Sequence, residues 1–166
     1  MDFPEPTVPG DRADVLLRYL DYFRGCVTEK IRSLPAHAQV ASVLPSGWTP
    51  LQLAVHLRYM ERRWLVWGFV GEPVDDPWGD APDGQWVVPI GMSGDGVLAA
   101  LLSQGERTRD IVTAAHLHDI GAPGPRWDGG APATLERVLL HVLQEYARHL
   151  GQLDVVVELT TGDTGE

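Results

Sequence analysis

Apolar residues recur at steps of three and four along four segments of the chain, which is the spacing of one buried helix face. We expect helices over residues 11–33, 49–69, 93–116 and from 132–134 to about 159. Proline and glycine are frequent between these segments, and no stretch alternates convincingly between apolar and polar positions as a strand would. The pattern predicts an all-α protein, a four-helix bundle with long connections between its helices.

The start of the second helix carries the clearest capping signal. Thr49 can cap the helix, Pro50 has no amide hydrogen to satisfy, and Gln52 stands at the third position of a capping box. Asp11 is the expected cap of the first helix. The third helix is expected to begin near Ser93, although the glycines that follow leave its start open.

The connection over residues 71–92 is longer than an ordinary turn, since loops beyond ~15 residues in compact domains tend to be crossovers, lids or binding loops. It holds four acids, at Asp75, Asp76, Asp80 and Asp83. Their spacing does not match the twelve-residue calcium loop of helix-loop-helix proteins. We therefore interpret the segment as a solvated crossover.

Length and charge narrow the class of protein. A chain of 166 residues fits one domain over 1–166, with a core over about 11–159. Its 13 Lys and Arg against 23 Asp and Glu give a net charge of −10, which repels phosphate backbones, so we expect no nucleic-acid partner. No run approaches ~18 uncharged apolar residues, so we expect no membrane partner.

The single cysteine, Cys26, excludes an intrachain disulfide and a multi-cysteine zinc site, and we interpret it as part of the core.

The first ten residues hold acids and prolines where a secretion signal needs a basic start and an apolar run. We therefore expect a cytoplasmic protein.

Ionisable side chains lie on the apolar faces of the second and last helices. His56 shares its face with Leu53 and Trp67, and Glu145 and His149 stand one turn apart in the apolar stripe of the last helix. A buried carboxylate costs several kcal/mol unless it is paired, protonated or bound to a cation. These positions are therefore the candidates for chemistry.

Two ligands at positions i and i+4 of one helix, with a third from a facing helix, can hold one metal ion. Imidazole and carboxylate suit zinc, nickel, iron or manganese, and three protein ligands leave positions open for water or substrate. The alternative is a surface ion pair between Glu145 and His149, with His56 as a hydrogen-bonded core residue. Spacing by itself leaves both interpretations open.

Two blocks of sequence resemble the DinB-like (YfiT-like) superfamily of four-helix metalloproteins. They are Pro45–Pro50 with His56 and Glu61–Trp64, and Thr134–His141 with Glu145–Gly151. Within that superfamily the chain is similar to uncharacterised members related to mycothiol-dependent maleylpyruvate isomerase. The resemblance covers residues 11–158.

The resemblance implies a divalent metal held by His56 from the second helix and by Glu145 and His149 from the last. Zinc is expected first, with nickel, iron and manganese as alternatives. It also implies a low-molecular-weight thiol such as mycothiol as co-substrate, a small electrophile as partner, and a homodimer built through a helix face. Trp64 and Trp67 could serve that interface, although core packing explains them equally well.

The last helix departs from the family pattern at one position. Many relatives have a second histidine where this chain has Gln152, which makes Gln152 a candidate for the wall of the cavity. His141, one turn before Glu145, could be a ligand, could line the cavity or hydrogen-bond a ligand, or could be structural. Arg148 and Asp154 could orient ligands or bind substrate, with surface ion pairing as the alternative.

His116 and His118, near the end of the third helix, could attract adventitious metal, but we interpret them as part of a solvated loop.

Three functions remain open at this point. The first is a metal-dependent thiol S-transferase or isomerase, in which no separate general base stands out. The second is hydrolysis by activated water in the same site. The third is a helical binding or stress-response module that is not an enzyme, which a fourth ligand from His141 would favour.

Overall fold

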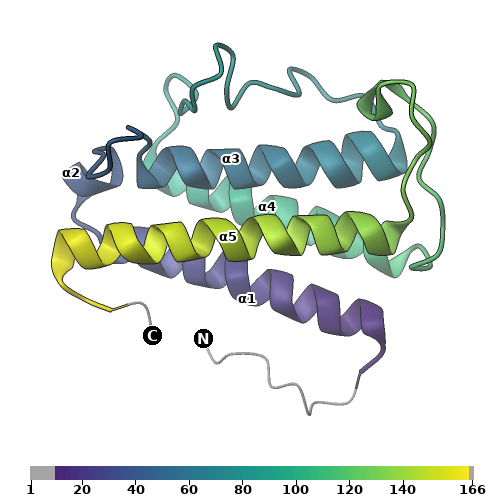
Figure 1. The fold of residues 1–166 in the computed structure, drawn as a ribbon, viewed down its shortest axis with the longest axis horizontal. Coiled ribbons are helices and arrows are strands. Elements are labelled where there is room, and N and C mark those ends of the chain that lie inside the picture. Colours follow the sequence, from purple (N-terminus) through teal and green to yellow (C-terminus); the bar gives the residue numbers. More distant parts are fainter. Residues whose placement is uncertain (1–9, 165–166) are drawn as a thin grey trace.

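A computed structural model describes residues 10–164, and within this range the protein is all-helical without strands, as predicted (Figure 1). One isolated bridge joins Ile120 and Thr134. The elements in chain order are α1 (Arg12–Ser33), α2 (Ala36–Gln39), α3 (Pro50–Arg62), η1 (Arg63–Val70), α4 (Gly94–Thr113), η2 (Pro125–Trp127) and α5 (Leu135–Thr161). The four long helices form the bundle, and α2 and η2 are short additions in its connections.

The four long helices begin close to their predicted starts, and the caps predicted at Asp11 and Thr49 are confirmed. Asp11, Thr49, Ser93 and Thr134 each accept a hydrogen bond from a backbone amide in the first turn that follows. Thr49 and Gln52 complete the predicted capping box, with Pro50 at the first helical position. The helix ends agree less well, because α4 stops at Thr113 and α5 continues to Thr161.

The helices pair as α1 with α5 and α3 with α4. In Figure 1 the connection after η1 runs back along the whole length of α3 before α4 begins, so α3 and α4 point the same way. α5 lies beside α3 and runs in the opposite direction (Figure 1). The seam between α3 and α5 is therefore covered on one side by the 71–93 crossover.

The second predicted helix changes its winding part-way. Its last turns, η1, are π-helical, a wider form that in proteins is often found near functional sites. It ends at Gly71, whose φ of +79° suits glycine, and a Cβ there would lie 2.7 Å from Cβ of Ala122. The wider winding sets the directions in which Arg63 and Trp64 leave the helix.

A buried polar cluster ties the four long helices together. Glu61 is fully buried and accepts hydrogen bonds from Arg24 Nη2 at 2.6 Å, from the Tyr146 hydroxyl at 2.7 Å and from Thr108. Burial and the negative charge of Glu61 raise the pKa of Tyr146, and Glu61 outweighs burial in raising the pKa of Arg24. The hydrophobic pattern predicted none of this cluster.

The rest of the interior is apolar, and Cys26 packs against it as predicted. No helix in the described part of the chain is long and apolar enough to cross a bilayer. The residues at the start of the chain, on which the expectation about secretion rests, lie outside the described range except for Gly10.

Candidate metal centre

The seam between α3 and α5 brings together the three residues predicted from the sequence. One ligand atom from each of His56, Glu145 and His149 lies within 4.8 Å of the others. His149 Nε2 is 3.3 Å from Glu145 Oε2, and the rings of the two histidines meet edge to face with centroids 5.0 Å apart. The side chains are largely shielded, at 15%, 18% and 8% exposure. Metal binding by this triad stays a prediction.

Each histidine is held by its second ring nitrogen. His56 Nδ1 lies 3.0 Å from a carboxylate oxygen of Asp80, and His149 Nδ1 lies 2.8 Å from the amide oxygen of Gln152. Both partners are acceptors, so Nδ1 donates in each case, and in the neutral ring this leaves the lone pair on Nε2. Metal-binding histidines in proteins are usually fixed in this way. The donor set and its tautomers therefore fit a divalent ion.

The pKa of His149 also suits a metal ligand. Burial lowers the pKa of His149 and outweighs the upward effect of the Gln152 hydrogen bond, and the neighbouring His56 lowers the pKa further. The imidazole is therefore neutral at neutral pH, as a metal ligand must be.

Asp80 is held from a second side by Arg63. The guanidinium donates from Nη1 to Asp80 Oδ1 at 2.5 Å and from Nη2 to Oδ2 at 3.2 Å, and both side chains are buried. Burial alone would raise the pKa of Asp80, but the hydrogen bonds from His56 and Arg63 outweigh it and lower the pKa. Asp80 is therefore ionised, and it accepts from His56 as a carboxylate.

This corrects the interpretation of the 71–92 connection as a solvated crossover. The segment is exposed at Asp75, Asp76 and Asp83, but Asp80 is 1% exposed and belongs to the site. The sequence did contain a signal, because Arg63 falls on a buried helix position and a buried guanidinium requires an acidic partner. Which of the four acids supplies it depends on the path of the segment, which has no periodicity to reveal it.

The same segment contributes Trp86, which the sequence analysis also missed. Its ring stacks on His56 with centroids 4.2 Å apart and meets His149 edge-on at 5.4 Å. Trp86 thus covers one side of the triad with an apolar surface, which limits the access of water to the two histidines.

The arrangement agrees with a comparison to protein families. A model described as Mycothiol-S-transferase matches residues 15–162. The chain belongs to this family. The match spans the four long helices and confirms the resemblance to the DinB-like superfamily. A comparison with curated proteins gives no match.

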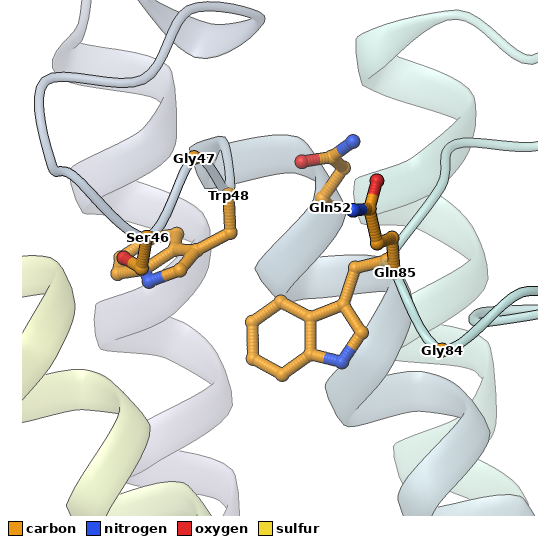
Figure 2. A pocket seen from close by; sticks show the side chains of 7 residues that line it. Ser46, Gly47, Trp48, Gln52, Gly84 and Gln85 are labelled. Atoms are coloured by element: carbon orange, nitrogen blue, oxygen red, sulfur yellow. The ribbon is translucent and has the colours of Figure 1, made fainter.

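In this mycothiol S-transferase family member, a pocket of about 320 Å³ opens beside the triad, between the start of α3 and the crossover (Figure 2). We call it the amide pocket; its walls are Ser46, Gly47, Trp48, Gln52, Gly84, Gln85 and Trp86. In Figure 2 the amides of Gln52 and Gln85 reach toward the same side of the pocket. Trp86 is a wall of the pocket and also covers the triad, so the two are neighbours.

The other candidates on the last helix have different surroundings. Gln152 holds His149, as described, and thus lies behind a ligand rather than in the wall of the amide pocket. His141 Nε2 is 3.8 Å from Glu145 Oε1 and its ring meets Trp64 edge-on, so it lies beside the triad and outside it. Asp154 pairs with Lys30 at 2.7 Å, as the surface alternative predicted.

Three further candidates have exposed side chains. Arg148 is exposed on α5. His116 and His118 are exposed in the turns after α4, as predicted, and they are not among the described groups that could hold an ion.

Proposed function

We propose that the chain is a metal-dependent mycothiol S-transferase whose divalent ion is held by His56, Glu145 and His149. The observation that carries the proposal is the pair of histidines fixed through Nδ1, with one ligand atom of each lying within 4.8 Å of a carboxylate oxygen of Glu145. Membership of the mycothiol S-transferase family supplies the thiol. Zinc is the ion we expect first, because a mixed imidazole and carboxylate set suits it.

Three protein ligands leave coordination positions open, and a divalent ion bound there lowers the pKa of a coordinated thiol. The thiol releases its proton to water, the sulfur gives its electron pair to the electrophilic carbon, and a carbon–sulfur bond forms while the leaving group departs with the electrons of the broken bond. Trp86 limits water around the reacting atoms, and Asp80 and Gln152 fix the orientation of the two imidazoles.

The amide pocket supports a thiol with a sugar-like body. It offers the aromatic rings of Trp48 and Trp86, the amides of Gln52 and Gln85, and no charged side chain. Gln52 Oε1 accepts from the Thr49 amide at 2.8 Å, which leaves its NH₂ for a ligand. Aromatic faces with neutral hydrogen-bonding groups suit a hydroxyl-rich, uncharged molecule. We propose that the body of the thiol lies here.

The position of His141 favours an enzyme over a module with a structural ion. Its ring rests against Trp64 and its nearest nitrogen is 3.8 Å from Glu145, so it does not complete a fourth ligand in this arrangement. An open coordination sphere is the mark of a catalytic site.

The test is thiol transfer by the untagged protein loaded with zinc. Mycothiol and 1-chloro-2,4-dinitrobenzene are incubated with the protein, and the loss of free thiol and the mass of the adduct are followed. We expect turnover that disappears in His149→Ala and persists in His118→Ala, an exposed histidine that serves as the control. Equal rates with and without the protein, or with both variants, would refute the proposal.

Nickel, iron or manganese in place of zinc, a homodimer and a cytoplasmic location are further proposals. The alternative metals rest on the ligand chemistry, the homodimer rests on the resemblance, and the location rests on the expectation from the sequence. Metal analysis by plasma mass spectrometry and light scattering during gel filtration test the first two. In the structure Trp64 packs against Trp127 and His141 of its own chain.

A further inference from the structure

A second cleft, of about 340 Å³, opens on the opposite side of the triad from the amide pocket. It lies between η1, the η2 segment and the first turns of α5. We call it the arginine cleft; the side chains that matter are Trp64, Arg126, Trp127, Asp128, Arg137 and His141.

Arg126 is a half-buried cation without a matching anion. Its guanidinium lies 3.7 Å from the centre of the Trp64 ring, and its Nε is buried without a hydrogen-bond partner. Among residues 10–164 it forms no ion pair with a carboxylate. Burial and the positive charge of Arg63 both lower the pKa of Arg126. A guanidinium stays charged nonetheless, so the cleft carries an uncompensated positive charge.

The other charges around the cleft leave it positive. Arg137 adds a second permanent cation, and Asp128 is the one acid in the wall as described. Arg63, close behind, is already paired with Asp80. A local excess of positive charge stands out in a chain with a net charge of −10. A planar guanidinium with free donors is suited to a carboxylate.

The cleft ends at the triad. His141 forms part of its wall, contacts Trp64 and lies 3.8 Å from Glu145. Along α3, Gln52 of the amide pocket stands one turn before His56, and Trp64 stands about 12 Å after it by the helical rise. The two hollows therefore lie on either side of the triad along α3 and η1, the uncharged pocket before His56 and the cationic cleft after it.

We propose that the arginine cleft binds the carboxylate of the electrophile, so that the second substrate is an organic acid with its reacting carbon several bonds away from the carboxylate. The assignment of the acid as an electrophile rests on the proposed function. The binding of a carboxylate in the cleft does not. Trp64 and Trp127 would flank an aromatic or unsaturated acid.

The first experiment measures binding by the full-length protein freed of metal with a chelator, so that a carboxylate cannot bind through an ion. Benzoate and its neutral counterpart benzamide are titrated separately by calorimetry. We expect benzoate to bind and benzamide to bind at least about tenfold more weakly. Arg126→Gln should weaken benzoate at least about tenfold. Arg32→Gln removes the same charge from an exposed position on α1 and should leave the affinity unchanged.

Equal binding of benzoate and benzamide would overturn the proposal, and so would equal affinities in Arg126→Gln and Arg32→Gln. Circular dichroism shows whether Arg126→Gln keeps its helices. If it does not, Arg137→Gln replaces it, because Arg137 is exposed and its loss should weaken benzoate severalfold without disturbing the packing. An unchanged affinity in Arg137→Gln would then overturn the proposal.

A second experiment separates this inference from the proposed function. The zinc-loaded protein is given mycothiol with 4-(chloromethyl)benzoate or 4-(chloromethyl)benzamide, in which the thiol sulfur displaces chloride. We expect Arg126→Gln to lower the ratio of kcat/KM for the acid over the amide at least about tenfold. If benzoate binds through Arg126 but no thiol transfer occurs, the carboxylate site is supported and the proposed transferase function is refuted. If transfer occurs with equal kcat/KM for the acid and the amide, the transferase function is supported and the carboxylate site is refuted.

Discussion

Asp80 determines how His56 presents its ring to the triad. The carboxylate accepts from His56 Nδ1 and is itself held by two hydrogen bonds from Arg63. The chain of contacts runs from η1 through the crossover to α3, so the orientation of one ligand depends on a residue 24 positions away in the sequence. Substitution of a group that holds a metal ligand in this way typically lowers metal affinity by about 10–100-fold.

We predict that Asp80→Asn lowers zinc affinity by roughly tenfold or more while the helices remain. The amide keeps the shape of the side chain but removes the negative charge that holds the proton on Nδ1 of His56 and pairs with Arg63. Competition with a chromophoric chelator measures the affinity. Asp83→Asn, an exposed acid of the same segment, is the control. An affinity in Asp80→Asn as high as in the control would show that Asp80 does not orient His56.

Gln152 has the corresponding role for His149, and it stands where many relatives have histidine. We predict that Gln152→Ala lowers zinc affinity by about tenfold, because the Nδ1 proton loses its acceptor at 2.8 Å. Gln144→Ala, at an exposed position of α5, should leave the affinity unchanged in the same chelator assay. Matching losses in the two variants would mean that the effect comes from the helix and not from His149.

At the scale of the helices, starts were easier to predict than ends or connections. Caps are local, so Asp11 and Thr49 could be recognised from a few neighbouring residues. The π-helical winding of η1 and the route of the 71–93 crossover depend on packing with distant segments. Spacing on two helices made His56, Glu145 and His149 candidates and the family resemblance joined them in one triad, whereas Asp80 and Trp86 lie on the crossover and could not be placed from any pattern.

Two glycines in helices illustrate how close the helices approach. A Cβ on Gly105 of α4 would lie 2.9 Å from Arg24 Cδ, and Arg24 is buried and held by Glu61. Gly151 of α5 is exposed and has nothing within 4 Å of such a Cβ. The same substitution should therefore have opposite effects at the two sites.

We predict that Gly105→Ala destabilises the protein by about 1–3 kcal/mol, because Arg24 must move and its hydrogen bonds to Glu61 weaken. Gly151→Ala should stabilise by about 0.5–1 kcal/mol through helix propensity. Urea unfolding of the two variants and the parent measures both changes. A stabilised Gly105→Ala protein would show that α4 and α1 have room that the structure does not give them.

For the molecule as a whole, the core and the metal triad occupy separate layers. The apolar interior and the cluster around Glu61 join α1, α3, α4 and α5, whereas the triad lies on the seam of α3 and α5 beneath the crossover. A fold held in this way does not require the ion, in contrast to small domains that fold only on binding zinc. Metal binding and folding should therefore be separable by mutation.

We predict that metal-free protein keeps its helix content and that zinc at 100 times its Kd adds about 2.7 kcal/mol to the free energy of unfolding. His149→Ala should lose this increment, and the stoichiometric ion with it, while its metal-free stability changes little. Glu61→Gln should behave in the opposite way. It removes the buried carboxylate that pairs with Arg24 and leaves the partly exposed Asp21 as the remaining charged partner, so unfolding should become easier by about 1–3 kcal/mol, yet zinc should still stabilise the variant.

Thermal unfolding with and without zinc, together with plasma mass spectrometry of the purified proteins, measures both effects. If zinc still stabilises His149→Ala, the ion binds elsewhere. If zinc no longer stabilises Glu61→Gln, the cluster around Glu61 and the triad depend on each other.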